Sequence, residues 1–313
     1  MSQIRESLEE YLTTRRAAGF KMHTTATTLD QFVSYAETQG AEFVTTPLAL
    51  EWALLPADAQ PIWRASRLDM VRLFAKHLSA SEPRTEVPPK GLLPRCYQRP
   101  KPYIYSDLEV ERILQVARDL PSPTGLRAWT YTTYLGLLAV TGMRMGEAIH
   151  LDRSDVDIEH GLLTLRHTKH GKGRHIPIHP TTKKALLTYQ THRNRYYPRA
   201  KTPSFFLGEQ GRRLHKETVR STFIKLSRQI GLRDPSQSRG PRLHDLRHRF
   251  AVQTMIGWYR AGADVEAQLP KLSTYLGHAN IQATYWYLTA VPELLQLATS
   301  RLSSRLKAKE LAP

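Results

Sequence analysis

The chain has 313 residues, of which 41% are hydrophobic and 23% charged, and this composition favours a globular protein with room for two ordinary domains. Four of its first ten residues are charged, and its longest strongly apolar run, residues 134–140, is too short to cross a bilayer. The single cysteine, Cys96, excludes an internal disulfide. We therefore expect a cytoplasmic protein without a signal peptide or membrane span, and its net charge of +17 favours a polyanionic partner.

Residues 1–80 are predicted to be helical. Apolar spacing indicates helices over 4–19, 25–39 and 59–78, which Gly19, Gly40 and Pro83 would terminate. Six prolines follow between positions 83 and 102, in a stretch without periodicity. The sequence thus predicts a helical domain over 1–95 with a proline-rich interdomain linker at about 83–104.

Residues 104–313 combine helices with three short strands. Ser106 and Glu109 form a capping box at the start of the first helix. Periodicity and turn residues predict strands at 156–158, 162–167 and 174–178, and helices at 106–120, 125–141, 181–195, 216–230, 243–259, 265–276, 281–290 and 292–306. The predicted fold class is mainly α with a small antiparallel β-sheet, or α+β.

The basic charge belongs to this second region. Residues 1–90 contain 10 Lys/Arg and 11 Asp/Glu, whereas residues 91–313 contain the remaining 35 Lys/Arg and 17 Asp/Glu. Such an excess favours nucleic acid as the partner. The alternatives are a chain that is basic only for solubility and a membrane-surface protein, which the lack of a predicted helix with opposed basic and aromatic faces disfavours.

The segment TGMRMGEAI, residues 141–149, contains the first candidate site residue. Gly142 interrupts an apolar helix, and Arg144 lies where a new helix begins. A positive charge is unfavourable at the positive end of the helix dipole. Its position is explained if the arginine and the helix N-terminus both face an anion. Glu147 lies three residues on, within reach of Arg144. The alternative is a surface ion pair.

The segment HDLRH, residues 244–248, contains the second set. Three-residue spacing places His244 and Arg247 on one helix face, where histidine can exchange a proton and arginine can hold two phosphate oxygens. His248 is four residues from His244, but the glutamate and third ligand of a zinc site are missing. We expect His248 to be a packed, hydrogen-bonded residue.

The segment LGHANIQATYWY, residues 276–287, places His278 at a turn before a helix with two tyrosines. Residues two apart on a helix point about 200° apart, so Tyr285 and Tyr287 cannot both address one phosphate. One is a candidate nucleophile, and the other should pack, as should Trp286.

The segment TKHGKGR, residues 168–174, is a basic turn between two predicted strands, and it lacks the pattern of a phosphate-binding P-loop. A lysine there can donate a proton or contact a DNA backbone. Four histidines at 167, 170, 175 and 179 suggest a metal site, but strand alternation would divide them between faces. We expect no bound metal.

Four of these segments, TGMRMGE, TKHGKGRHIP, HDLRH and LGHANIQATYWY, resemble in sequence and order the tyrosine recombinase, or integrase, family. The resemblance implies that Arg144 and Arg247 clamp the scissile phosphate and that Tyr287, nine residues after His278, is the nucleophile. It also implies that His244 exchanges the tyrosine proton. The catalytic set it implies is Arg144, Lys169, His244, Arg247, His278 and Tyr287.

Further details follow from the same resemblance. Lys169, with Lys172 as the alternative, would protonate the leaving oxygen, and Glu147 would support the site. Expected DNA contacts are Lys172, Arg174 and Arg242. The chain departs from many members at Leu288-Thr289, where they have a histidine, and its longer stretch at 257–270 with the YWYL text resembles a transposon-associated branch.

The implied function is site-specific DNA recombination or integration by metal-independent strand cleavage and rejoining through a 3′-phosphotyrosyl intermediate, with no cofactor. The implied arrangement is a core-binding domain at 1–95 and a catalytic domain at 104–313. The partners would be double-stranded DNA, in the nucleoid, and further copies of the chain, from dimer to tetramer. The helix at 292–306 would dock on a neighbour or pack on its own domain. The alternatives are a type IB topoisomerase-like enzyme, a non-catalytic DNA-binding regulator and a zinc-dependent binding module.

Overall fold

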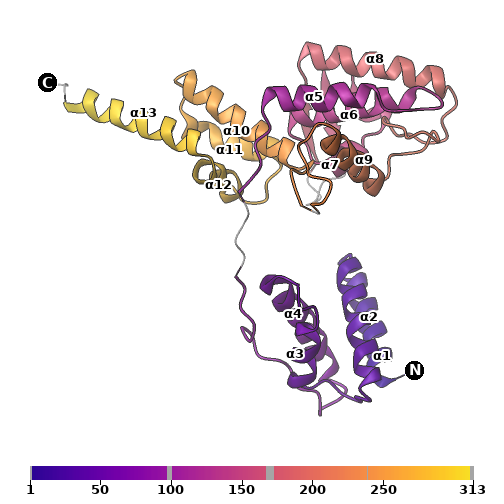
Figure 1. Cartoon of the computed structure of the whole chain (residues 1–313). Coiled ribbons are helices and arrows are strands. Elements are labelled where there is room, and N and C mark those ends of the chain that lie inside the picture. Colours follow the sequence, from indigo (N-terminus) through magenta and orange to yellow (C-terminus); the bar gives the residue numbers. More distant parts are fainter. Residues whose placement is uncertain (1, 97–100, 167–172, 238, 311–313) are drawn as a thin grey trace. The chain divides into compact units, whose positions relative to one another are not determined.

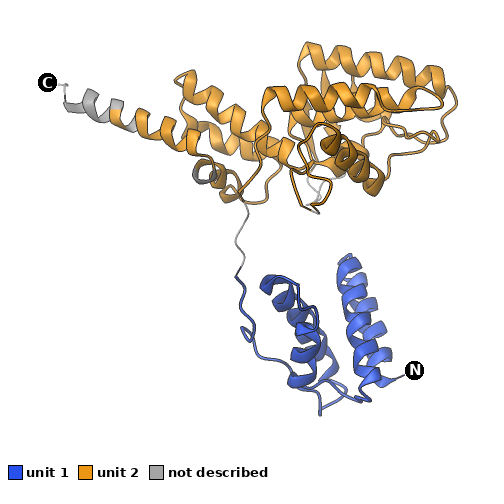
Figure 2. Ribbon diagram, in the orientation of Figure 1, with its two compact units in different colours: residues 1–100 blue, residues 101–313 orange. Residues whose placement is uncertain are grey.

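The computed structural model describes residues 2–96, 101–166, 173–237 and 239–310, without the side chains of 289, 290, 302 and 304–310. The chain divides into two compact units, Met1–Pro100 and Lys101–Pro313 (Figure 2). The division falls within the stretch that the sequence predicts to be a linker. None of the helices in the described ranges is long and apolar enough to cross a membrane.

Unit 1 contains four described helices, α1 (Gln3–Ala17), α2 (His23–Thr38), α3 (Thr46–Leu54) and α4 (Pro61–Leu78) (Figure 1). Their apolar faces enclose a core that includes Leu8, Phe32, Trp52 and Phe74. Helix α3 is not predicted from the sequence, because nine residues are too few to establish a helical period. The local signal is the cap: the Thr45 side chain accepts a hydrogen bond from the Leu48 backbone N–H, and a proline stands in the first turn.

Unit 2 is predominantly helical, with one small sheet. The sheet has the order β1-β2-β3 and is antiparallel, with Leu163 facing Val156 on one side and Ile176 on the other. The predicted fold class is confirmed. The elements are α5 (Asp107–Arg118), α6 (Leu126–Thr141), α7 (Met145–Ile149), η1 (Arg153–Asp155), β1 (Val156–Asp157), β2 (Leu162–Leu165), β3 (Arg174–Pro177), α8 (Pro180–Tyr196), α9 (Lys216–Gln229), α10 (Asp245–Arg260), α11 (Val265–Leu276), α12 (Gln282–Ala290) and α13 (Pro292–Glu310).

Two hydrophobic cores stabilise unit 2. One joins α5, α6, α8 and α9 to the sheet and includes Tyr134, Leu163 and Phe206. The other joins α10 to α13 and includes Met255 and Leu269. Helix α10 packs on α6 as well as on α11, α12 and α13, so it connects the two cores. A side chain on α10 can therefore reach both halves of the unit.

Two glycines in the left-handed conformation end the helices that lead into the candidate site. Gly142 has a φ of +61° at the end of α6, and Gly277 has a φ of +64° at the end of α11. A Cβ atom on Gly142 would lie 2.5 Å from the Phe250 ring, and one on Gly277 would lie 2.7 Å from Arg174 Nη1. Both positions need glycine for conformation and for space, and each directs the chain sharply into a functional loop.

Candidate active site

Arg247 lies at the junction of α6, α10 and α11. Its Nη1 donates to the Gly142 carbonyl at 2.9 Å, and its Nη2 donates to the Leu276 carbonyl. The residue is only 2% exposed, and burial together with the charge of Arg144 lowers its pKa to about 10. Its guanidinium stays protonated near neutral pH, and two of its five N–H groups are used by these carbonyls, which fixes its orientation.

Arg144 approaches the same junction from the start of α7. Its Nη2 donates to the Gly277 carbonyl at 2.7 Å, and Gly277 directly follows Leu276, whose carbonyl Arg247 contacts. Its Nη1 donates to Glu147 Oε1, and its backbone N–H donates to Glu147 Oε2, both at 2.8 Å. Two guanidinium groups from separate helices are thus held at consecutive carbonyls, immediately before His278.

Glu147 is a buried carboxylate between two arginines. Besides Arg144, it accepts both terminal nitrogens of Arg174, at 2.8 and 3.0 Å. Burial alone would raise the pKa of Glu147, but hydrogen bonds from Arg174 and Arg144 outweigh it and lower the pKa. This fork-to-fork pair with Arg174 fixes the carboxylate, and the carboxylate fixes Arg144.

Arg174 therefore lies in the support of the site, where the sequence analysis expected a DNA contact. Its Nε donates to the Tyr275 carbonyl at 2.7 Å, and its side chain is only 10% exposed. A direct DNA role for Arg174 stays a prediction, but the contacts that the structure provides are to Glu147 and to the loop that leads into His278. Arg242 is different, because its side chain is half-exposed and pairs with Asp245 at 2.9 Å.

His244 lies at the surface beside the two arginines. Desolvation by the surrounding protein, followed by the charge of Arg247, lowers the pKa of His244 to about 4. Although its side chain reaches the solvent, His244 is therefore neutral at neutral pH. Its ring stands edge-on to His248, with 4.8 Å between centroids.

Tyr287 is buried in α12, with 1% of its surface exposed, and its hydroxyl is 2.8 Å from Nδ1 of His248. Tyr287 also interacts electrostatically with Arg247. Tyr285 is 42% exposed, so the two tyrosines face different surroundings, as helix geometry requires. His248 is buried and hydrogen-bonded as expected, but nothing in the sequence indicates that Tyr287 is its partner.

His278 follows the left-handed Gly277 and lies near the same tyrosine. Its Nδ1 is 2.8 Å from the Thr284 hydroxyl, which orients the imidazole from within α12. Its ring is stacked on that of Tyr287, with centroids 6.5 Å apart. The structure thus gathers Arg144, His244, Arg247, His278 and Tyr287, with Glu147 behind them, around the junction of α7, α10, α11 and α12.

Lys169 and Lys172 lie outside the described residues, so their predicted roles are not placed. The first residue of β3 after them, Arg174, is the one that binds Glu147. No group of three or more His, Cys, Asp or Glu suited to a metal ion occurs among the residues that the structure covers.

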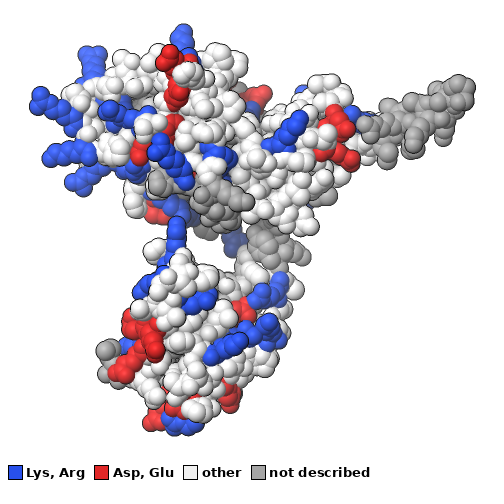
Figure 3. All heavy atoms as spheres, turned by 180° about the vertical axis from the view of Figure 1, so that it is seen from behind, with Lys and Arg blue, Asp and Glu red and all other residues white. Residues whose placement is uncertain are grey.

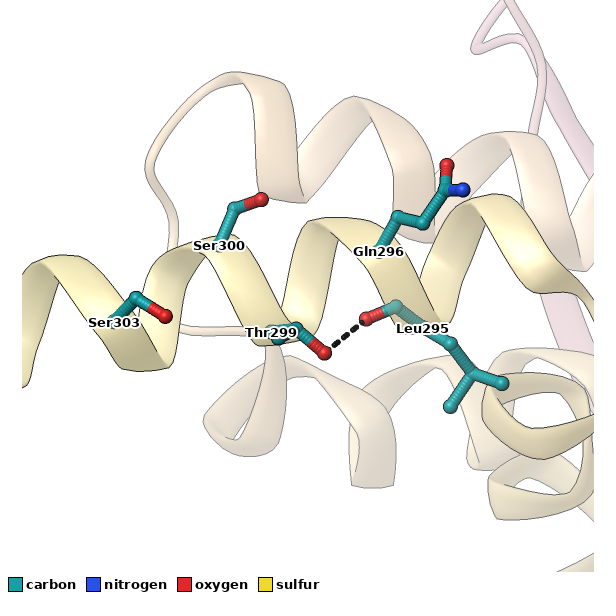
Figure 4. A pocket seen from close by; sticks show the side chains of 5 residues that line it. All are labelled: Leu295, Gln296, Thr299, Ser300 and Ser303. Atoms are coloured by element: carbon teal, nitrogen blue, oxygen red, sulfur yellow. Dashed lines mark hydrogen bonds between the residues drawn. The ribbon is translucent and has the colours of Figure 1, made fainter.

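Two other surface features of the chain lie apart from the converging side chains of the site or are not placed at them. On the face shown in Figure 3, Lys and Arg side chains gather over one end of unit 2, whereas acidic and basic side chains alternate on unit 1. A shallow hollow on α13, lined by five residues of that one helix, includes none of the site residues (Figure 4). The site is therefore defined by side chains that converge from the start of α7, from α10, from the loop after α11 and from α12.

Comparison with known proteins shows the family of the chain. The profile of the phage integrase family matches residues 105–293. A putative integrase/recombinase, y4rB, of Sinorhizobium fredii is 44% identical over 97% of this chain and 98% of its own length. The tyrosine recombinase XerC of Herpetosiphon aurantiacus is 28% identical over 92% of this chain and 90% of its own.

Solved structures share the fold. The Tn1549 transposon integrase in complex with transposon right end DNA has a TM-score of 0.63 at 16% identity, covering 95% of this chain and 99% of that one. A lambda integrase tetramer bound to a Holliday junction has a TM-score of 0.58 at 18% identity, covering 84% and 75%. The chain belongs to the phage integrase family, and it is a tyrosine-type site-specific DNA recombinase.

Proposed function

We propose that this recombinase cuts and rejoins DNA strands through a covalent 3′-phosphotyrosyl intermediate on Tyr287, without a metal ion. The observation that carries the proposal is the meeting of Arg144 and Arg247 at the consecutive carbonyls of Leu276 and Gly277, just before the helix of the tyrosine. Two guanidinium groups fixed side by side suit the non-bridging oxygens of one phosphodiester.

In the first step, the Tyr287 oxygen attacks phosphorus and the bond to the 5′ oxygen breaks. The developing charge falls on the non-bridging oxygens, where Arg144, Arg247 and His278 stabilise it. Neutral His244, beside Arg247, would complete this ring of hydrogen-bonding groups. Lys169 would protonate the departing 5′ oxygen.

In the second step, a 5′ hydroxyl from a partner duplex attacks the phosphotyrosine and releases Tyr287. The linkage preserves the bond energy, so the exchange needs no nucleotide hydrolysis. The relatives are integrases and recombinases, and this favours strand exchange over relaxation of supercoils by a topoisomerase-like enzyme.

The partners in this proposal are double-stranded DNA and further copies of the chain. Support comes from the basic excess in residues 91–313 and from relatives of the same fold that are described as bound to DNA, one of them as a tetramer. Residues 1–95 would form the second half of a clamp on the duplex. Part of α13 packs on its own unit, since Leu294 is buried in the second core, while its exposed face is left for a neighbour.

The test traps the cleaved strand. A duplex is first selected from a randomised library for binding to the full chain. Versions of it are then prepared with a nick at successive positions. When cleavage occurs next to a nick, the short fragment that bears the new 5′ hydroxyl diffuses away, so the strand cannot be rejoined. We expect a covalent protein–DNA adduct in the presence of a chelator, absent with Tyr287→Phe and retained with Tyr285→Phe. An adduct that persists with Tyr287→Phe, or that requires a divalent cation, would overturn the proposal.

A further inference from the structure

We infer that His248, supported by Asp245, is the catalytic base that removes the phenolic proton of Tyr287. This inference rests on the proposed function, in which Tyr287 is the nucleophile. It differs from the role that the sequence resemblance assigned to His244. The geometry points to His248 because its imidazole, and not that of His244, is the one that the structure places in hydrogen-bond contact with the hydroxyl.

The contact is short and buried. His248 Nδ1 and the Tyr287 hydroxyl are 2.8 Å apart, within the range for direct proton transfer, and the two residues are 3% and 1% exposed. The two rings also meet edge to face, with 5.4 Å between centroids. A tyrosine hydroxyl sequestered in this way exchanges its proton with its protein neighbour more readily than with bulk water.

Asp245 lies on the other side of the imidazole. Its Oδ1 is 3.7 Å from His248 Nε2, and the carboxylate is buried and fixed by hydrogen bonds from the backbone N–H and the guanidinium of Arg242. A carboxylate on the Nε2 side favours the tautomer with its proton there, which leaves Nδ1 to accept from the phenol. It also stabilises the imidazolium that forms when the phenolic proton arrives, in the manner of the buried acid of a catalytic triad.

The remaining neighbours of His248 are compatible with this role. His244 stands edge-on to it and is neutral near pH 7, and Trp286 contacts it at 5.8 Å between centroids. Arg247, the residue before His248, interacts electrostatically with Tyr287. One arginine therefore stabilises both the phosphate and the attacking phenolate.

Cleavage and rejoining each move one proton and exchange one bond at phosphorus. The Tyr287 hydroxyl gives its proton to His248 Nδ1, the phenolic oxygen bonds to phosphorus, and the bond from phosphorus to the 5′ oxygen breaks as that oxygen takes a proton from the general acid. In the reverse direction, the 5′ hydroxyl attacks phosphorus, and the departing phenolate recovers its proton from His248. Neither step needs an oxidant, a reductant or a metal.

The experiment measures the rate of adduct formation by the full chain on the nicked duplex. His248→Gln keeps a hydrogen-bonding side chain but cannot take up the proton, so the rate should fall by a factor of roughly 10² or more. His192→Gln, on α8, is the matched control and should retain the wild-type rate. The unfolding midpoint of each variant establishes that it is folded, and its DNA affinity establishes that it is bound to the duplex during the measurement.

Two further measurements separate a base from a merely structural histidine. In His248→Ala, added imidazole should raise the rate, because the vacated space admits a replacement base. A duplex whose leaving 5′ oxygen is replaced by sulfur needs no proton on the leaving group. It should therefore restore the rate of adduct formation in Lys169→Ala but not in His248→Gln. Asp245→Asn should lower the rate less than His248→Gln does.

The outcomes distinguish the two proposals. If the wild type forms no adduct, or Tyr287→Phe still forms one, the proposed function fails and this inference fails with it. If wild type and Tyr287→Phe behave as expected but His248→Gln cleaves at the wild-type rate, only the inference fails. Correction of His248→Gln by the sulfur-containing duplex would also overturn it, because His248 would then act on the leaving group.

Discussion

The two sides of the active site are built differently. On the phosphate side, Arg144 and Arg247 are held by backbone carbonyls and by a buried carboxylate, which depend on the fold and not on a titrating histidine. On the nucleophile side, Tyr287 and His278 are oriented by side chains, His248 and Thr284. The phosphate side is thus prearranged, whereas the nucleophile side depends on protonation and on the placement of α12.

Helix α12 contains the nucleophile. It has only nine residues, so its stability depends on its packing against α10, α11 and α13. Tyr287, on this helix, is buried, and its hydroxyl contacts His248 on α10. The placement of α12 therefore decides whether the tyrosine and its base meet, while the arginines are held by the rest of the site.

The sharpest test of a prearranged phosphate side is Arg247→Lys. Lysine keeps the charge but cannot bind the Gly142 and Leu276 carbonyls together with two phosphate oxygens, so cleavage should slow by a factor of 10² or more with little change in DNA affinity. Single-turnover cleavage on the nicked duplex provides the measurement. Arg249→Lys, whose arginine pairs with exposed Asp107, is the control. Equal rates for the two variants would mean that position 247 contributes only charge.

Glu147→Gln tests whether the buried carboxylate maintains that side. Its loss leaves Arg144 and Arg174 without their anion and should cost about 3 kcal/mol of unfolding free energy at neutral pH. Because the folded-state pKa of Glu147 lies below its ordinary 4.5, the carboxylate stabilises the protein above that pH and loses its contribution as the pH falls. The difference in unfolding free energy between wild type and variant should therefore shrink on acidification. A difference that grows at low pH would contradict this assignment.

Arg174 and Arg242 provide a comparison between support and DNA contact. Arg174→Ala should destabilise the protein and slow cleavage without altering the salt dependence of DNA binding, because its guanidinium is occupied by Glu147 and Tyr275. Arg242→Ala should lower the slope of log affinity against log salt by about one, as expected for a lost phosphate contact. Titrations at several salt concentrations measure both slopes. A reduced slope for Arg174→Ala would restore its predicted DNA role.

How much the sequence could predict depended on how local each signal was. The helices around the site and the residues Arg144, Arg247 and Tyr287 stand in contiguous motifs, and the structure brings these residues together. The partner of Arg174 lies 27 positions away and that of His248 lies 39 away, so only the folded chain shows these contacts. Lys169 remains a prediction. Helix α3 was missed because its cap, and not its periodicity, is its local signal.

The smallest effect on stability and cleavage is expected for a substitution in α13, which should mainly change how copies of the chain assemble on DNA. Leu295 is 46% exposed and lies on the same side of the helix as Thr299, whereas the Gln296 side chain points to the other side (Figure 4). Leu295→Ala should alter unfolding free energy by no more than about 0.5 kcal/mol, because little buried surface is lost. If this face docks on a neighbour, the variant should bind a second copy to a two-site duplex less cooperatively, while single-site binding and cleavage stay unchanged. Gln296→Ala is the control on the same helix. Unaltered cooperativity in Leu295→Ala would mean that α13 serves only its own unit, whose core it already reaches through Leu294.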